Sequence, residues 1–333
     1  MDVSELLDPF ERLLADVSTP AAIRAIEAEG DASRLWAACA QSGFLDALVP
    51  EAAGGAGLSL ADVAPLLIAL GRHAAPVPVA ETMVARALLA RAGIAIPQGP
   101  IVLATARGGF AGAVPLALVA SHVLVDTGDA LVLSALCDAT VEPTGVHNDL
   151  AARLSWAGAP SGPTLPSPEG GLRAIAAIIR AAAIAGAADR LLDMTVSYAN
   201  ERVQFGKPIG KQQALQQNLA VMAEQAVSAR LAAQAGCAGG FPPSLQAAAV
   251  AKQVASAVAA HIANTAHAVH GAIGISEEFD LQLFTRRLHE WRLADGSESW
   301  WAQVLGALRL GVDATSADFV RLGAAPQIPG RVA

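Results

Sequence analysis

The residues best suited to binding a small anion lie in one short stretch, 201–213. It contains Arg202, Lys207 and Lys211, although the chain as a whole carries a net charge of −8. Guanidinium and ammonium groups bind phosphate and carboxylate groups, and Phe205 adds a flat apolar face. Neutral donors and acceptors come from Gln204, Gln212 and Gln213. The stretch predicts a site for one small anion; the alternative is that Arg202 balances a helix dipole at a C-terminus.

Other residues that could do chemistry are interpreted as structural. His261, His267 and His270 lie on or just past one predicted helix, and a pair at i, i+3 could hold a metal, but core or interface positions are the simpler interpretation. The glycine clusters at 54–57 and 108–112 lack a following Lys-Ser/Thr pair and indicate turns. No metal site is predicted.

The three cysteines, Cys39, Cys137 and Cys237, lie about a hundred residues apart, which fits neither metal-ligand spacing nor a disulfide framework. We expect buried free thiols.

Composition and charge exclude several classes of protein. A net charge of −8 and a pI near 5.3 argue against nucleic acid as a partner, because a phosphate backbone requires a concentrated basic face. Hydrophobic residues make up 53% of the chain, so a membrane span must be considered. The most apolar run, 174–188, contains Arg180 and is followed by two charged residues, which favours a buried helix. The first nine residues show no targeting signal, so we expect a cytoplasmic protein.

The chain divides into parts that differ in residue pattern, and the elements that position the anion-binding stretch belong to the C-terminal part. Apolar periodicity predicts helices over 6–17, 21–40 and 60–70, in an N-terminal helical domain spanning 1–96. A reduced β-rich middle module follows at 97–168, with expected strands at 101–103, 116–120, 123–125 and 130–133 and a proline-rich linker at 158–171. Residues 169–320 predict a four-helix bundle, and 321–333 a tail. The expected bundle helices are 173–202, 211–235, 243–269 and 280–312.

Several strings resemble the acyl-CoA dehydrogenase family. GFL at 43–45 with VPEAAGGAGL at 49–58 is similar to the family's N-terminal segment, and ERVQFGKPIGKQQ at 201–213 to its RxxFGxxI run. The family's glycine turn is similar to HGAIGIS at 270–276. Its basic helix and EGT loop are similar to the arginine pair at 286–287 and to DGS at 295–297. The resemblance implies a mainly α protein with the same three-part order, and the oxidation of an acyl-CoA thioester with FAD as cofactor.

In the family, the connecting run and the glycine turn reach across a dimer interface to the ADP half of the neighbour's flavin. The resemblance therefore implies that FAD is bound by Arg202, Gln204, Phe205, Gln212, Gln213, Ala268, Gly271, Ala272 and Ser297. The family's catalytic Glu corresponds to Asp295, which keeps the carboxylate on an arm shorter by one methylene. A second location that the family uses for its base is occupied here by Leu172. Of the nearby acids, Glu290 and Glu298 are expected to point elsewhere, and Glu277 and Glu278 to be solvated or helix-capping.

The middle module departs from the family. At about 70 residues it is short, and it lacks both the TEPxAGSD-like loop and the W-x-T strand that hold the flavin ring and thioester. This combination resembles the smaller subunit of heterotetrameric acyl-CoA dehydrogenases of bacterial steroid side-chain degradation. The resemblance implies a larger partner that carries the catalytic Glu, a steroid side-chain CoA ester as substrate, and electron-transfer flavoprotein or a similar acceptor. The alternatives are a self-sufficient homo-oligomer using Asp295 and a non-catalytic scaffold.

Overall fold

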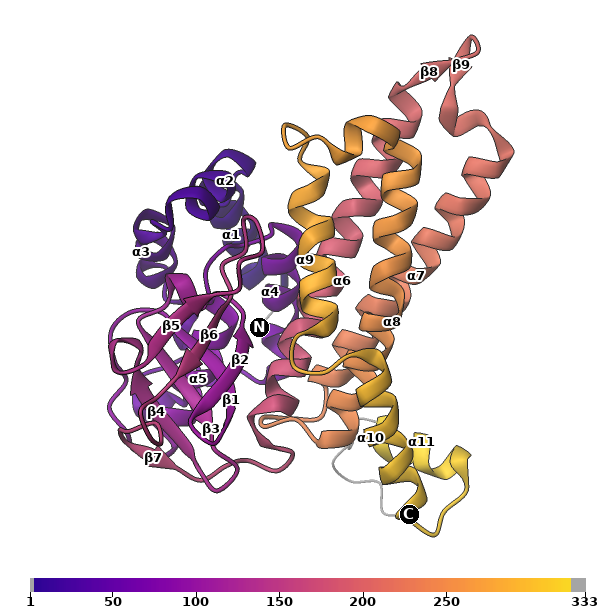
Figure 1. The fold of residues 1–333 in the computed structure, drawn as a ribbon. Helices are drawn as coiled ribbons and strands as arrows, with labels where there is room; N and C mark the ends of the chain where they lie inside the picture. The colour runs from indigo at the N-terminus through magenta and orange to yellow at the C-terminus, as the bar shows by residue number, and fades with distance from the viewer. Residues whose placement is uncertain (1–2, 325–333) are drawn as a thin grey trace.

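The N-terminal part is helical, as expected. The computed structural model describes residues 3–324 (Figure 1). The first five α-helices are α1 (Val3–Val17), α2 (Pro20–Glu29), α3 (Ser33–Gln41), α4 (Leu60–Arg72) and α5 (Val79–Arg91). The single periodic run expected at 21–40 is two helices, because Gly30 ends α2 in the left-handed conformation, with φ of 75°. Ser59 and Asp62 form a capping box that fixes the start of α4.

The middle module is one seven-stranded sheet, with order β5-β6-β2-β1-β3-β4-β7. Its strands are β1 (Ile101–Arg107), β2 (Phe110–Val114), β3 (His122–Asp126), β4 (Leu131–Ala135), β5 (Thr140–Pro143), β6 (Ala152–Ser155) and β7 (Thr164–Leu165). β1 and β3 are parallel, with Ile101 opposite His122, and the other pairs are antiparallel.

Two expectations for the middle module were wrong. The strand expected at 116–120 is a short 3-10 turn, Ala117–Val119, because Leu116 adopts a positive φ of 60° that a strand excludes. The proline-rich linker contributes the edge strand β7, which pairs with β4, and an edge is where a proline-flanked strand is tolerated. Cys137 is exposed after β4, whereas Cys39 and Cys237 are buried as expected.

The C-terminal part is a helical bundle built on one long buried helix. Its helices are α6 (Gly171–Glu201), α7 (Gln213–Cys237), α8 (Leu245–His270), α9 (Leu281–Leu293), α10 (Glu298–Leu310) and α11 (Ser316–Ala324). The single helix expected at 280–312 is broken at 294–297, where Asp295 and Gly296 have positive φ values of 59° and 108°. α6 is long and apolar enough to span a membrane, but 89% of its most apolar window is buried inside the protein, so it is a core helix.

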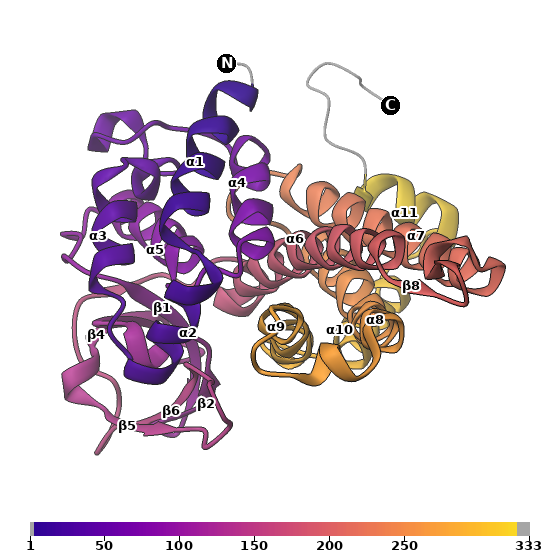
Figure 2. The ribbon, with the colours of Figure 1, turned by 90° about the horizontal axis from the view of Figure 1, so that it is seen from above.

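α6 connects the two halves of the molecule. Gly186 on α6 and Gly71 on α4 let the two helices touch through their backbones, since a Cβ on either would lie about 2 Å from a carbonyl oxygen, 1.9 Å and 2.1 Å respectively. Seen from above, the N-terminal helices and the sheet lie on one side and the bundle on the other, with α6 running from the junction outward (Figure 2). At its far end, α6 joins α7 through a hairpin of β8 (Val203–Gln204) and β9 (Lys207–Pro208) that projects from the bundle (Figure 1).

Candidate functional site

The residues predicted to form one site lie at two ends of the molecule. Arg202 is the C-cap of α6, whereas Asp295 pairs with Arg180 on the same helix, 22 residues earlier. At a rise of about 1.5 Å per residue, these two positions on α6 are roughly 33 Å apart. The two places therefore lie toward opposite ends of α6.

The hairpin end presents the predicted anion-binding residues to the outside. Gln204 pairs with Lys207, and Phe205 and Gly206 form the two-residue turn with φ values of 49° and 78°. Both residues of such a turn need positive φ, so Phe205 is held at the tip by a backbone strain that Gly206 tolerates more readily. Its ring is 93% exposed. Arg202 and Gln204 are also exposed, and Arg202 makes no ion pair within residues 3–324.

The glycine turn lies at the same end of the bundle. α8 ends at His270, and Gly271 leaves the helix with φ of 63° and ψ of −138°. The ring of Tyr198, near the end of α6, stacks on His270 with centroids 4.4 Å apart, and its hydroxyl donates to the His270 carbonyl at 3.4 Å. The turn is thereby tied to the helix that carries the hairpin. Ala268, Gly271 and Ala272 are exposed here, and Gln212 and Gln213 start α7 beside the hairpin.

This end of the bundle fits the ADP half of a flavin. An exposed guanidinium that has no carboxylate partner in the described chain can neutralise a diphosphate. A flat aromatic ring beside it can stack on an adenine. Neither group is used by the fold of this chain, since both project from the bundle into solvent.

Asp295 lies in the turn between α9 and α10, with its carboxylate bound in a buried ion-pair cluster. Arg180 places Nε 3.2 Å from Asp295 Oδ2 and Nη1 2.6 Å from Glu81 Oε1. Burial lowers the pKa of Arg180, but the two carboxylates outweigh it and the pKa is raised above its usual value. Ser297, predicted to contact FAD, accepts a hydrogen bond from Trp300 N as the N-cap of α10. Its hydroxyl is therefore used by the fold, far from the hairpin.

Lys252, on α8, holds the turn between α9 and α10 that contains Asp295. Its side chain is fully buried on α8, and Nζ donates to Ser256 Oγ, Arg292 O and Gly296 O, each at 2.9 Å. Burial lowers the pKa of Lys252 to about 7, although the nearby Asp295 carboxylate opposes that shift. A buried lysine donating to two main-chain carbonyls at either end of a turn holds its backbone in place. The sequence offered no signal for this residue.

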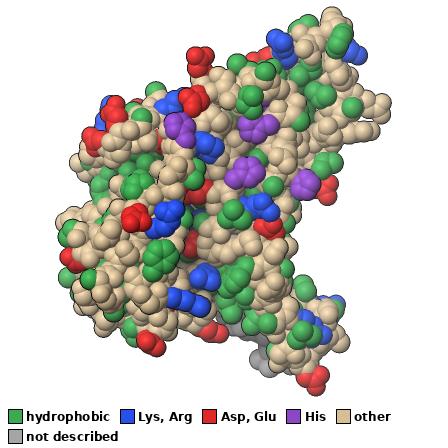
Figure 3. Space-filling model, viewed as in Figure 1, with side chains coloured by type: hydrophobic (Ala, Val, Ile, Leu, Met, Phe, Trp, Pro, Cys, Tyr) green, Lys and Arg blue, Asp and Glu red, His purple; other side chains and the backbone are tan. Residues whose placement is uncertain are grey.

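A cleft of about 810 Å³ opens beside Asp295, between the sheet and α9. Figure 3 shows acidic and basic side chains gathered along this seam. The expectation that Glu290 points elsewhere was wrong, because its side chain lines the cleft. Burial raises the pKa of Glu290 to about 7, with Asp149 adding to the shift and Arg180 and Arg287 opposing it. Glu298, as expected, points away from the cleft and pairs with Arg292.

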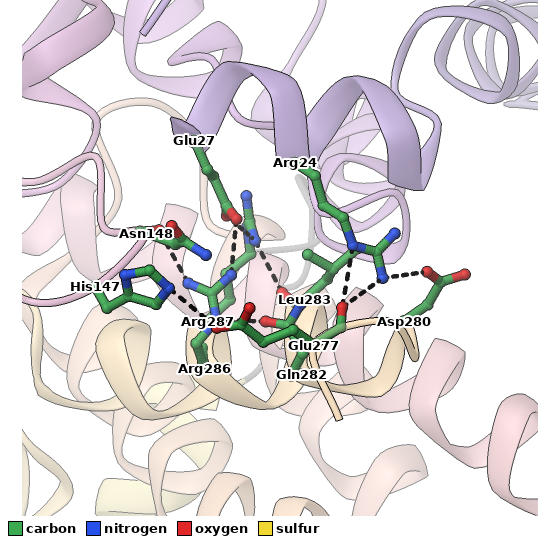
Figure 4. Close-up of polar contacts among 10 residues, drawn as sticks. All are labelled: Arg24, Glu27, His147, Asn148, Glu277, Asp280, Gln282, Leu283, Arg286 and Arg287. Carbon is green, nitrogen blue, oxygen red and sulfur yellow. Dashed lines mark hydrogen bonds and ion pairs between the residues drawn. The ribbon is translucent and has the colours of Figure 1, made fainter. Parts of the chain in front are cut away.

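A charged network closes one side of the cleft and joins all three parts of the chain (Figure 4). Glu27 reaches from α2 to Arg286 at 2.7 Å and to Arg287 at 2.9 Å on α9. Arg286 also donates to the carbonyl of Asn148 in the β5–β6 connection. The remaining members are Arg24 with Asp280 and the exposed pair His147 with Glu277.

His267 and His270 take the structural positions that were expected, whereas His261 does not lie in the core. His270 is buried against Tyr198 and Phe279, and His267 Nε2 lies 2.9 Å from Thr285 Oγ1. His261 is exposed on α8. Among residues 3–324, no group of three or more His, Cys, Asp or Glu side chains could hold a metal ion.

Comparisons with known proteins agree with the fold. Residues 2–95 and 174–306 match the families described as "Acyl-CoA dehydrogenase, N-terminal domain" and "Acyl-CoA dehydrogenase, C-terminal domain". The chain is 34% identical to acyl-CoA dehydrogenase IpdE2 of Mycolicibacterium smegmatis, covering 85% of this chain and 91% of that protein. It is 35% identical to acyl-CoA dehydrogenase IpdE2 of Mycobacterium tuberculosis, covering 85% and 90%.

Two solved structures show the same fold. One, named as a Tcur3481-Tcur3483 steroid ACAD variant, has a TM-score of 0.81 and 29% identity, covering 93% of this chain and 98% of that chain. The other, the ChsE4-ChsE5 complex from Mycobacterium tuberculosis, has a TM-score of 0.83 at 22% identity, covering 94% and 99%.

Proposed function

The chain belongs to the acyl-CoA dehydrogenase family, whose members use FAD, and from that premise we propose that it completes a flavin site housed mainly by a larger partner. In this proposal, two copies of each chain assemble, and the larger chain carries the catalytic carboxylate. The observation that carries the proposal is the placement of Arg202 and Phe205, which project from the end of the bundle farthest from this chain's own sheet (Figure 1).

In this proposal, the hairpin and glycine turn bind the flavin of the larger chain. A bound flavin supplies the hydride acceptor for α,β-dehydrogenation of an acyl-CoA thioester. Arg202 neutralises its diphosphate, Phe205 offers a face to the adenine, and the exposed backbone at Gly271 and Ala272 lets the dinucleotide approach closely. Gln204, Gln212, Gln213 and the Ala268 position complete this surface.

This chain's own cleft is poorly suited to the same reaction. Asp295 would have to accept a proton, but its carboxylate is already bound in an ion pair with the Arg180 guanidinium. A cavity lined by Arg180, Glu81 and Trp291 lies beside this ion pair, and its volume of about 30 Å³ is the space of one water molecule.

The substrate and acceptor are proposed from relatives. The name of the Tcur3481-Tcur3483 protein joins two components and describes it as a steroid ACAD. This supports a heteromeric enzyme that acts on a steroid side-chain CoA ester. Reduced flavin would pass its electrons to electron-transfer flavoprotein or a similar acceptor.

Co-expression with a larger acyl-CoA dehydrogenase chain from the same organism tests the proposal. The purified pair should be yellow, with bound FAD, and this chain alone colourless. Arg202→Ala should lower the flavin content of the pair severalfold without dissociating the two chains, and Phe205→Ala should weaken flavin retention less. Arg12→Ala, an exposed arginine on α1, is the matched control and should keep its flavin.

Flavin content unchanged in the Arg202→Ala pair would contradict the shared site and leave the chain as a scaffold. A second candidate function, a self-sufficient homo-oligomer, is favoured by one observation, the position of Asp295 on the wall of an 810 Å³ cleft. Three results together would establish that alternative: the single purified chain binds FAD stoichiometrically, an acyl-CoA reduces this FAD, and the dehydrogenase activity is lost in Asp295→Asn.

A further inference from the structure

The cleft between the sheet and α9 has the size and lining of a ligand site. Its volume is about 810 Å³, and apolar side chains form much of its wall, including Leu116, Leu150 and Trp291. A half-enclosed apolar cleft with a few polar groups is the usual form of a small-molecule site. If this chain seats no flavin of its own, as proposed above, the cleft remains free for another ligand.

The charges that line the cleft do not balance. Four carboxylates, those of Glu27, Asp149, Glu290 and Asp295, face three guanidinium groups, those of Arg153, Arg286 and Arg287. Behind them, Arg180 is shared by Glu81 and Asp295. His289 also lines the cleft. With His289 neutral and every acid ionised, the lining therefore carries one uncompensated negative charge.

That charge belongs to Glu290. Glu27 is held by Arg286 and Arg287, and Asp295 by Arg180. Asp149 accepts hydrogen bonds from Thr144 Oγ1 and Ala151 N, at 2.7 Å and 2.9 Å. Within residues 3–324, the Glu290 carboxyl has neither an ion pair nor a hydrogen bond, although Arg180 and Arg287 lie near enough to influence it.

The environment makes Glu290 hold its proton unusually well. Its pKa is raised to about 7, chiefly by burial and with smaller contributions from Asp149 and Glu81, and this value already includes the opposing effect of Arg180 and Arg287. A cation placed beside Glu290 would supply the missing counter-charge and keep the carboxylate ionised. Trp291, the next residue on α9, also lines the cleft.

We infer that this cleft binds a compact, largely apolar molecule that carries one cationic amine, with the Glu290 carboxylate as its counter-ion. The apolar body is held by Leu116, Leu150 and the rest of the apolar lining. The inference rests on the proposed function only in requiring that no flavin occupies the cleft.

Three probes with one apolar body and different charges test it: 1-adamantanemethylamine, 1-adamantanemethanol and 1-adamantanecarboxylate. Binding is measured by calorimetry on the full chain in complex with its larger partner. At pH 8 the amine should bind roughly tenfold or more tightly than the alcohol, since a hydrogen-bonded charge pair contributes at least that ratio. The amine should lose about tenfold in affinity between pH 8 and pH 6, because a carboxyl with a pKa near 7 becomes protonated over that range.

Two variants separate the role of Glu290 from that of the fold. Glu290→Gln should remove the preference for the amine and its pH dependence, and keep the affinity for the alcohol, which also shows that the cleft is intact. Arg153→Gln removes a cation from the cleft wall and should not weaken binding of the amine. Within residues 3–324, the hydrogen bonds of this guanidinium go to the main-chain carbonyls of Pro143 and Thr144.

The inference is overturned if the carboxylate or the alcohol binds as tightly as the amine, if Glu290→Gln leaves the amine affinity unchanged, or if none of the probes binds. Flavin content, measured in the same samples, keeps the two proposals apart. Arg202→Ala should lose flavin and keep the amine site, and Glu290→Gln should do the reverse.

Discussion

Nε of Arg180, on α6, lies 3.2 Å from Oδ2 of Asp295, in the turn between α9 and α10. The same guanidinium binds Glu81, on α5, so one buried cation joins the N-terminal helices to the C-terminal bundle. Asp295 is the residue that the family resemblance marked as a base. In the folded chain it is one of two anions that neutralise a buried arginine.

Replacing Arg180 should therefore destabilise the chain strongly. Arg180→Met leaves two acids buried without a cation, which typically costs about 3–5 kcal/mol. Urea unfolding of the variant should show a loss of that size. Adding Glu81→Leu should recover part of it, because one of the stranded charges is then gone. Arg72→Met is the control: its partner Asp193 is about half exposed, so the loss should stay within about 1 kcal/mol.

Glu27 should hold α2 against α9. Its side chain is 2% exposed and lies between two arginines, so Glu27→Gln removes the charge that pairs with both. Hydrogen exchange of the α2 amides should become faster, with residues in α4 unaffected. The exposed pair His147 and Glu277 provides the comparison, and His147→Asn should change exchange in α2 very little. Unchanged protection of α2 in Glu27→Gln would show that the apolar contacts of Ile23 and Ile26 hold the helix by themselves.

Glu290 should make stability depend on pH in a defined window. Its pKa is about 7 in the folded chain and 4.5 as the ordinary value, so the folded state binds the proton more tightly. The contribution of this tightly held proton to the free energy of unfolding is fully present below pH 4.5 and is lost as the pH rises through 7. The shift corresponds to roughly 3 kcal/mol, at about 1.4 kcal/mol per pH unit.

Glu290→Gln cannot titrate and should not show this loss. Relative to the wild type, the variant should therefore gain roughly 2–3 kcal/mol in unfolding free energy between pH 5 and pH 8. Chemical denaturation at both pH values measures the difference. A constant difference between the two proteins over this range would mean that Glu290 is ionised freely in the folded state.

The mainly helical, three-part fold was predicted from the sequence, because apolar periodicity and glycine or proline punctuation are local signals. The missed strands had weak local signals: β5, β6 and β7 have two to four residues, and β2 consists mainly of alanine and glycine. The break in the expected helix 280–312 does carry a local signal, the Asp295-Gly296 pair with positive φ, which was missed. The hairpin end of the site was predicted by its motif, and its exposure agrees with a role outside this chain.

The sequence by itself determined most of the helical segments and which short motif, 201–213, resembles a cofactor-binding edge. Only the tertiary structure decided that Arg180 binds both Glu81 and Asp295, that Glu27 binds Arg286, and that Glu290 faces a cleft. The physical reason is range. In the sequence, Glu81 lies 99 residues from Arg180, and Arg180 lies 115 residues from Asp295. Glu27 lies 259 residues from Arg286. Charges at such separations meet only after the helices have packed, so no local pattern can record which acid receives a cation and which is left without one.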